Sequence, residues 1–148
     1  MRTIFDTATR KELIQRIAAL DERSTAQWGT MTIYQMVKHN TLWTEMILGR
    51  FFCKRVFLGR LFGRIALHSS LKNEKPMGHN APTSPELRVK DSYGDVALEK
   101  KKWIALLEEF EHFSNTDFVH PFFGAMTKEQ IGYHTYKHID HHLRQFNG

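Results

Sequence analysis

The apolar residues of this chain recur at the three- to four-residue spacing of amphipathic helices, and no segment alternates with the two-residue period of a strand. The pattern therefore predicts an all-α protein. A first helix is expected from about Thr9, because Thr9-x-x-Glu12 has the form of a capping box. Its apolar stripe consists of Leu13, Ile17 and Leu20.

Two further helices are predicted from an identical start signal. Thr32 with Gln35, and Thr127 with Gln130, each have the threonine and glutamine spacing of a capping box. The earlier of these helices is expected to stop near Gly49, because glycine readily adopts the left-handed conformation that ends a helix. Its apolar positions are Ile33, Met36, Val37, Trp43 and Ile47.

The remaining segments connect or complete this set. Residues 50–68 are predicted to form a shorter, glycine-interrupted helix, and residues 69–90, with three prolines, an irregular crossover. A further amphipathic helix is expected over about 95–113, and a loop over 115–125. The chain is thus predicted to be one bundle domain over residues 1–148, with a long crossover between its second and third helices.

Length and composition fit a globular domain with one core, since 148 residues with 41% hydrophobic and 25% charged residues are ordinary values. Cys53 is the single cysteine and cannot form an intramolecular disulfide. The N-terminal residues lack the pattern of a secretory signal, so we expect a cytoplasmic protein. The apolar region 46–67 is interrupted by five basic residues, which argues against a membrane span.

The same five basic residues, all between positions 50 and 64, account for the whole formal net charge of +5. A nucleic-acid or anionic membrane surface is one interpretation. The favoured one is that these side chains face water while their apolar neighbours pack inward. These neighbours are Phe51, Phe52, Phe57, Leu61, Phe62 and Ile65. Specific nucleic-acid binding is not expected, because no groove-reading motif accompanies the charge.

Candidate chemistry is concentrated in the last helix, which contains four histidines. At roughly 100° per residue, His142 and His138 lie about 80° and 40° from His134, within and at the edge of the apolar stripe. His141 points furthest from that stripe and is excluded as an inward residue. The solvent-facing arc is predicted to hold Lys137, Asp140 and Arg144.

An i, i+4 pair of histidines can share one cation, so His138 and His142 are predicted metal ligands. His39 is the best candidate for a third ligand, because it lies beside an apolar stripe where an unpartnered imidazole would be costly to bury. Neutral imidazoles suit transition ions, with zinc or nickel favoured here. Three protein ligands leave one position open to water, as in catalytic sites.

A catalytic base is harder to identify. Glu45 and Asp140 fall on the outward arcs of their helices, so neither is expected to face the ion. His134 and Gln145 lie near the ligands and are candidates for a base. We favour a different role for both, in which they orient the ligating imidazoles through hydrogen bonds.

At these residues the chain resembles the DinB-like superfamily. Residues 137–145 are similar to its closing helix, where the first and last histidines of an H-x-x-H-H stretch are ligands, here His138 and His142. Residues 35–39 resemble its helix-two segment, which supplies the third ligand, here His39. Four further pieces are similar to one uncharacterised branch of the superfamily, namely 28–31, 58–63, 83–87 and 120–124.

The resemblance implies a homodimeric four-helix bundle with a metal at one end. Several superfamily members are transferases or isomerases that use low-molecular-weight thiols such as bacillithiol or mycothiol. A metal-dependent, thiol-dependent transferase or a hydrolase acting on a small molecule is therefore one hypothesis. A non-enzymatic stress-response or binding module with a structural or vestigial metal site is the alternative. A nucleic-acid or membrane binder using residues 50–64 is a third, and the sequence leaves all three open.

Overall fold

The computed structural model describes residues 1–79 and 81–148 and is mostly helical. Its α-helices are α1 (Thr7–Ala19), α2 (Ile33–Ile47), α3 (Phe57–Leu71), α4 (Val96–Glu108) and α5 (Lys128–Gln145). Short 3-10 helices, η1 (Pro85–Leu87) and η2 (Glu109–His112), lie in the crossover and after α4. The prediction of a helical protein is confirmed in this sense.

A small hairpin departs from that prediction. Strands β1 (Val119–His120) and β2 (Gly124–Ala125) pair antiparallel, with Val119 opposite Ala125 and His120 opposite Gly124. The expectation that the chain has no strand was therefore wrong. Two-residue strands are too short to show a period-2 pattern, so they could not be predicted from the spacing of apolar residues.

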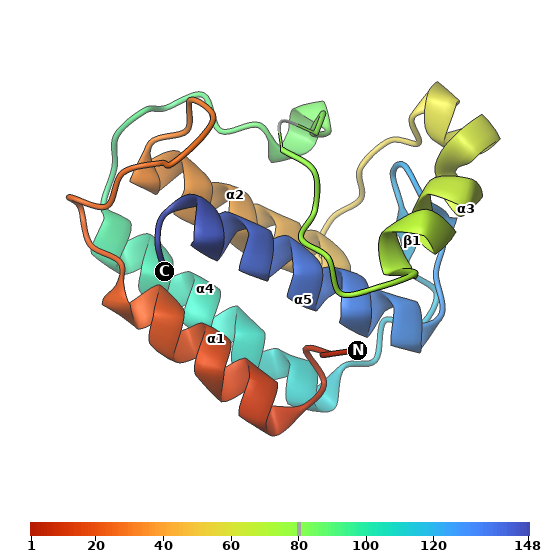
Figure 1. The fold of residues 1–148 in the computed structure, drawn as a ribbon, viewed down its shortest axis with the longest axis horizontal. Coiled ribbons are helices and arrows are strands. Elements are labelled where there is room, and N and C mark those ends of the chain that lie inside the picture. The colour runs from red at the N-terminus through yellow and green to blue at the C-terminus, as the bar shows by residue number, and fades with distance from the viewer. Residues whose placement is uncertain (80) are drawn as a thin grey trace.

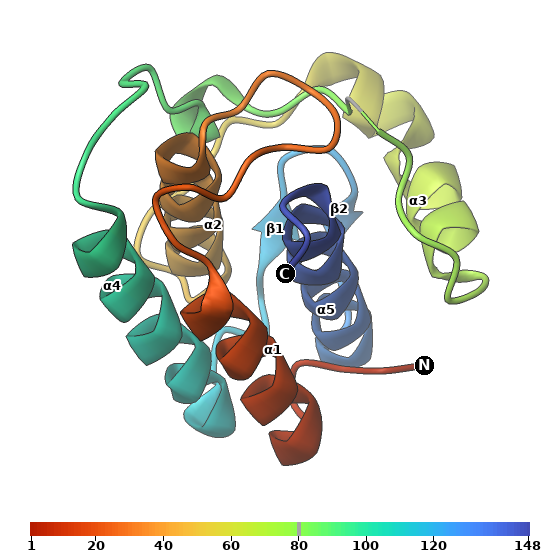
Figure 2. The same cartoon turned by 60° about the vertical axis from the view of Figure 1, so that its left-hand side comes forward.

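Helices α1, α2, α4 and α5 pack around one core. Both α1 and α2 contact α4 and α5, and α3 contacts α5 and β2 from outside this group (Figure 1). Figure 2 views the helices more nearly end on and shows α3 standing apart from the other helices, beyond α5. The largest fully buried side chains are Trp103, Phe110, Ile4, Leu13, Ile17, Met36, Met46, Ile47, Leu107, Ile131, Ile139 and Leu143.

Local capping fixes where the helices begin. Thr32 and Thr127 are N-caps with complete capping boxes, as predicted. Each threonine hydroxyl accepts from the backbone N–H of the glutamine three residues on, and the Oε1 of that glutamine accepts from the threonine backbone N–H. The expected capping box at Thr9 was wrong. Asp6 caps α1 instead, since its carboxylate accepts from the Thr9 backbone N–H at 2.7 Å, and Thr9 lies in the first turn.

The segment around α3 differs most from expectation. Residues 50–56 are not helical, and the helix begins at Phe57 and continues to Leu71. Of the six apolar side chains expected to pack inward, Phe51 alone packs against the core. The others are exposed, by 86% at Phe52, 72% at Phe57, 58% at Leu61, 55% at Phe62 and 71% at Ile65. The inward-packing interpretation was wrong, because the opposite face of α3, with Gly59 and Gly63, lies on the protein.

The outer arc of α5 is also more buried than predicted. Asp140 is buried because Arg16 of α1 and Arg144 donate to its carboxylate at 2.8 Å and 2.7 Å. Lys137 is buried because its ammonium donates to the carbonyl oxygens of Ser70 and Asn73 at the end of α3. Of the three residues predicted to face solvent, Arg144 alone does so. Among the residues described, no helix combines the length and apolar character needed to cross a membrane.

Candidate metal centre

Three histidines from two helices meet at the predicted position. His39 of α2 and His138 and His142 of α5 each offer one ring nitrogen, and these nitrogens lie within 4.8 Å of one another. All three side chains are buried, with exposed fractions of 3%, 8% and 8%. The i, i+4 pair on α5 and the single histidine on α2 are thus brought together as the sequence predicted, and they could hold a metal ion.

The spacing of two of these nitrogens fits a shared ion. The Nε2 atoms of His39 and His138 are 3.4 Å apart. Two imidazoles bound to one tetrahedral zinc at the usual metal–nitrogen distance have their nitrogens about 3.3 Å apart. The donor set consists of neutral imidazoles, which transition ions prefer and calcium or magnesium do not.

Hydrogen bonds orient two of the three rings. The Nδ1–H of His39 donates to the carbonyl oxygen of Leu87, at 3.0 Å, and the Nδ1–H of His142 donates to Oε1 of Gln145, at 2.9 Å. Gln145 is itself held because its Nε2 donates to the carbonyl oxygen of Trp28 at 2.9 Å. Since Nδ1 carries the proton in both rings, the Nε2 lone pairs are free to bind a cation.

His138 is held by packing instead. Its ring stacks on the indole of Trp43 with centroids 4.1 Å apart and planes at 9°. Its Nδ1 atom is buried and has no hydrogen-bond partner among the described residues. Its Nε2 atom faces His39. This difference between His138 and the other two rings was not predicted from the sequence.

Burial keeps the whole cluster in the neutral state that ligation requires. Desolvation lowers the pKa of His39, in spite of its hydrogen bond to Leu87, and lowers the pKa of His138 well below its usual range. Burial, followed by the proximity of His39, lowers the pKa of His142 to about 3. Neutral rings at physiological pH therefore present lone pairs rather than protons to a cation.

The two supporting candidates have different surroundings. Gln145 contacts His142 in the way expected of a residue that orients a ligand. His134 is 3% exposed, and neither of its ring nitrogens has a hydrogen-bond partner in the described part of the chain. Its ring lies among those of His120, Phe123 and Trp43, at centroid distances of 5.3, 4.9 and 5.8 Å. Burial, with a smaller contribution from Lys137, lowers the pKa of His134 to about 4.

His141 lies outside the cluster, as predicted. Its ring is near Trp28 and His79, at 5.6 Å and 6.0 Å between centroids, and the rings of Trp28 and His79 stack at 4.0 Å. Asp140 supplies no base to the centre, because both of its oxygens are engaged by arginines. Glu45 is half-buried and lies 3.8 Å from Arg50.

Three contributors were missed by sequence reasoning. The Leu87 carbonyl belongs to the backbone, so no side chain marks it. Trp43 was assigned to the core stripe, which is also where it lies, at 2% exposure. His120 was noted for its resemblance alone. Its Nδ1 accepts from the backbone N–H groups of Phe122 and Phe123, at 3.1 and 3.2 Å, and so shapes the hairpin loop beside His134.

Comparison with known proteins gives a family. No curated protein and no solved structure matches the chain significantly. One family model, described as "Protein of unknown function (DUF1569)", matches residues 4–148. The match covers nearly the whole sequence, including the three clustered histidines. The chain therefore belongs to the DUF1569 family.

Proposed function

We propose that this protein binds one divalent transition ion, zinc or nickel, through the Nε2 atoms of His39, His138 and His142, and uses it in metal-dependent group transfer or hydrolysis. The convergence of three buried neutral imidazoles carries the proposal. The resemblance to DinB-like bundles adds support, because the same three positions match the ligands of that superfamily. It also suggests a small-molecule substrate, a low-molecular-weight thiol as second cofactor and a homodimer.

The roles of the residues follow from their contacts. His39 and His142 bind through Nε2 because Leu87 and Gln145 accept their Nδ1 protons. Trp43 sets the plane of the His138 ring by stacking. A bound transition ion with an open position lowers the pKa of a coordinated water or thiol and supplies a nucleophile near neutral pH. His134 lies one turn from His138, and neither of its ring nitrogens has a hydrogen-bond partner among the described residues, so it is our candidate proton acceptor.

A specific observation favours the alternative of a non-enzymatic module. The three ligand side chains are at most 8% exposed, so the folded chain leaves a substrate little access to the ion. In that case the ion would stabilise the contact between α2 and α5, and no substrate would reach it. The two functions share the metal and differ in access to it.

Metal content tests the shared part. The protein is purified without chelator or nickel affinity resin, and zinc and nickel are measured by elemental analysis. His39→Ala, His138→Ala and His142→Ala should each lose stoichiometric metal. His141→Ala, which removes the histidine adjacent in sequence, is the matched control and should retain it. Retention of metal by His142→Ala with loss by His141→Ala would contradict the assigned ligands.

Activity separates the two functions. Metal-loaded protein is assayed for transfer of bacillithiol to a small electrophile and for hydrolysis of activated esters, with His142→Ala as the control. Turnover that depends on His142 supports the enzyme. A metal that raises the melting temperature without any turnover supports the module. In both cases metal affinity should hold below pH 7 and fall only at more acid pH, where protons compete for ligating nitrogens whose pKa values burial has lowered.

A further inference from the structure

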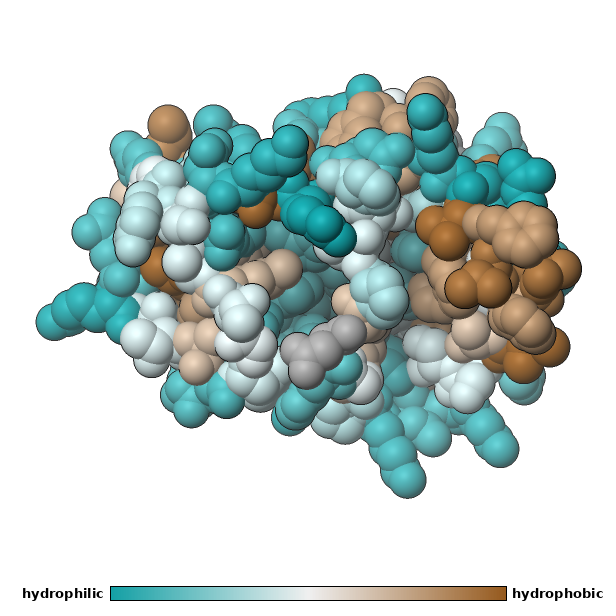
Figure 3. All heavy atoms as spheres, turned by 90° about the horizontal axis from the view of Figure 1, so that it is seen from above, coloured by the Kyte–Doolittle hydropathy of each residue, from teal (hydrophilic) through white to brown (hydrophobic). Residues whose placement is uncertain are grey.

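Helix α3 carries an exposed apolar face. It consists of Phe57, Leu58, Leu61, Phe62 and Ile65, with Phe52 from the preceding segment, and we call it the α3 face. Its three phenylalanines alone expose about 400 Å², taking about 200 Å² for a whole side chain. That value already lies within the roughly 300–600 Å² of the largest apolar patch on a typical monomer. Figure 3 shows apolar side chains gathered at the end of the molecule that α3 occupies.

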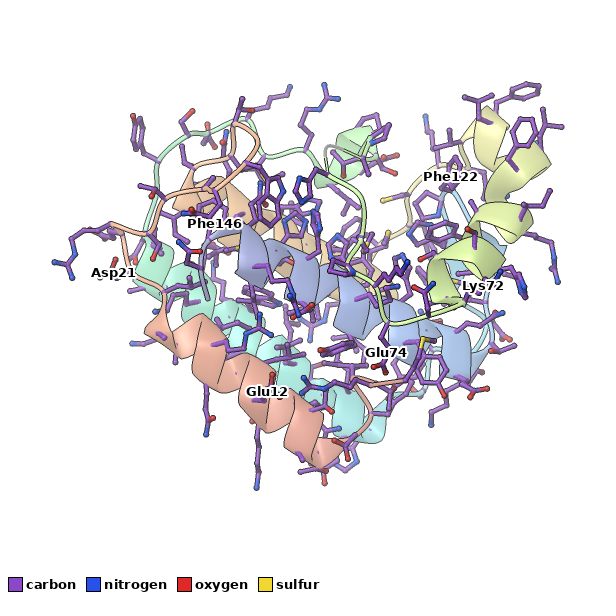
Figure 4. The ribbon with its side chains drawn as sticks, in the orientation of Figure 1. Glu12, Asp21, Lys72, Glu74, Phe122 and Phe146 are labelled. Atoms are coloured by element: carbon purple, nitrogen blue, oxygen red, sulfur yellow. The ribbon has the colours of Figure 1, made fainter. Side chains whose placement is uncertain are left out.

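The α3 face cannot turn inward, because the helix is fixed by its opposite side and its ends. A Cβ at Gly59 or Gly63 would overlap the backbone of Phe122, which lies beside α3 (Figure 4). Before the helix, the Val56 N–H donates to the Pro121 carbonyl at 2.9 Å. Around the C-terminal end of the helix, the Lys137 ammonium donates to the carbonyl oxygens of Ser70 and Asn73. The apolar side chains therefore face solvent in the folded chain.

Charge around the α3 face indicates what covers it. Residues 50–72 contain six basic and no acidic side chains. Arg50 pairs with Glu109, and Arg55 donates to the His120 carbonyl. Arg60 and Arg64 are exposed beside the apolar side chains, and neither forms an ion pair with a residue that the structure describes. The surface is thus apolar, flanked by free guanidinium groups, and complementary to an apolar surface that carries negative charge.

From this combination we propose that α3 is an interfacial helix that docks on anionic lipid membranes. Phenylalanine, leucine and isoleucine on one face, with arginine at the border, are the composition of helices that lie in the plane of the headgroup region. Arginine stems extend along apolar surface while their charged ends reach phosphate. A second copy fits less well, because a two-fold interface would bring the same basic face against itself, with no acidic residue from 50–72 to pair with it.

Vesicle binding of the whole chain of 148 residues tests the proposal. Cosedimentation is measured with phosphatidylcholine vesicles, with and without phosphatidylglycerol, and the oligomeric state is measured by sedimentation velocity. The wild type should bind the mixed vesicles and not pure phosphatidylcholine. Phe57→Ser/Ile65→Ser should abolish binding. Arg60→Gln/Arg64→Gln should weaken it about 25-fold, at about fivefold for each basic side chain near an anionic surface.

Tyr93→Ser is the matched control, because Tyr93 is 87% exposed and lies outside the α3 face. It should bind like the wild type. Circular dichroism confirms that each variant is folded. Absence of binding by the wild type overturns the proposal, as does binding that survives Phe57→Ser/Ile65→Ser or is equal on neutral vesicles. A dimer that dissociates in Phe57→Ser/Ile65→Ser without vesicle binding also overturns it and assigns the α3 face to a second copy. None of these results depends on the metal centre.

Discussion

Replacing His134 with leucine should stabilise the metal-free protein. The imidazole is 3% exposed, and neither ring nitrogen has a hydrogen-bond partner within the described residues. A buried polar group without a partner costs about 1–3 kcal/mol of stability. Leucine has a similar volume, favours helices and matches the apolar rings of Trp43 and Phe123 around the site. We expect His134→Leu to raise the free energy of unfolding by about 1 kcal/mol or more at pH 7.

The pH dependence of this gain provides a sharper measurement. Burial lowers the pKa of His134 to about 4, whereas an unfolded histidine titrates near 6.5. The unfolded wild type therefore takes up a proton that the folded state does not, and wild-type stability falls as the pH drops below about 6.5 towards 4. At pH 5 the loss amounts to about 2 kcal/mol. The gain from His134→Leu should grow by that amount between pH 7 and pH 5.

Urea titrations of wild type and variant at both pH values, with chelator present throughout, measure the difference. The other titrating groups contribute equally to the unfolding free energies of the two proteins, so their contributions cancel in the difference. His112→Leu, which removes an exposed imidazole, is the matched control. A gain that is the same at pH 7 and pH 5 would show that His134 is not buried as a neutral ring. A loss of several kcal/mol at pH 7 would show that its nitrogens have partners after all.

Two further substitutions test the supports of the metal centre and of α3. Gln145→Leu removes the acceptor of the His142 Nδ1 proton and should weaken metal affinity 10- to 100-fold, measured by competition with a chelator. Gln145→Glu keeps that acceptor but loses the donor to the Trp28 carbonyl, so it should weaken metal affinity less than Gln145→Leu does. Gly63→Ala should push α3 away from Phe122 and accelerate hydrogen exchange in that helix. Gly78→Ala is the control, because a Cβ there meets open space, and α3 should exchange in this variant as it does in the wild type. Equal exchange of α3 in the two variants would refute the close packing of Gly63.

Features that depend on local sequence were predictable. The capping boxes at Thr32 and Thr127 involve residues three apart, so the two helix starts were correct. The phase of the histidines along α5 follows from helix geometry, which selected His138 and His142 over His141. The partner from α2 was found because a histidine beside an apolar stripe needs a polar contact. In the structure both ring nitrogens of His39 have a polar neighbour. Nδ1 donates to the Leu87 carbonyl, and Nε2 faces Nε2 of His138.

Which face of a helix is buried could not be predicted where the covering segment is distant in sequence. The apolar arc of α3 and the glycine arc opposite it both satisfy a helical pattern, and the sequence alone favoured burial of the apolar one. The structure buries Gly59 and Gly63, because the absence of a side chain lets the hairpin backbone come close. The burial of Lys137 and Asp140 had a similar origin, since their partners come from α3 and α1, distant in sequence. Periodicity defines a face but does not identify its neighbour.

The composition of α5 argues that this helix was selected for more than packing. Several of its buried side chains are polar, and atoms of His134, Thr135 and His138 lack hydrogen-bond partners among the residues described. Each such group costs about 1–3 kcal/mol, so apolar residues would give a more stable helix. A bound ion would offset part of this cost, by about 4 kcal/mol when free metal is 1,000 times its dissociation constant. Buried polar atoms without hydrogen-bond partners are expected where function has been selected at the expense of stability, as in a metal centre. Here they lie on the helix that supplies two of the three clustered imidazoles.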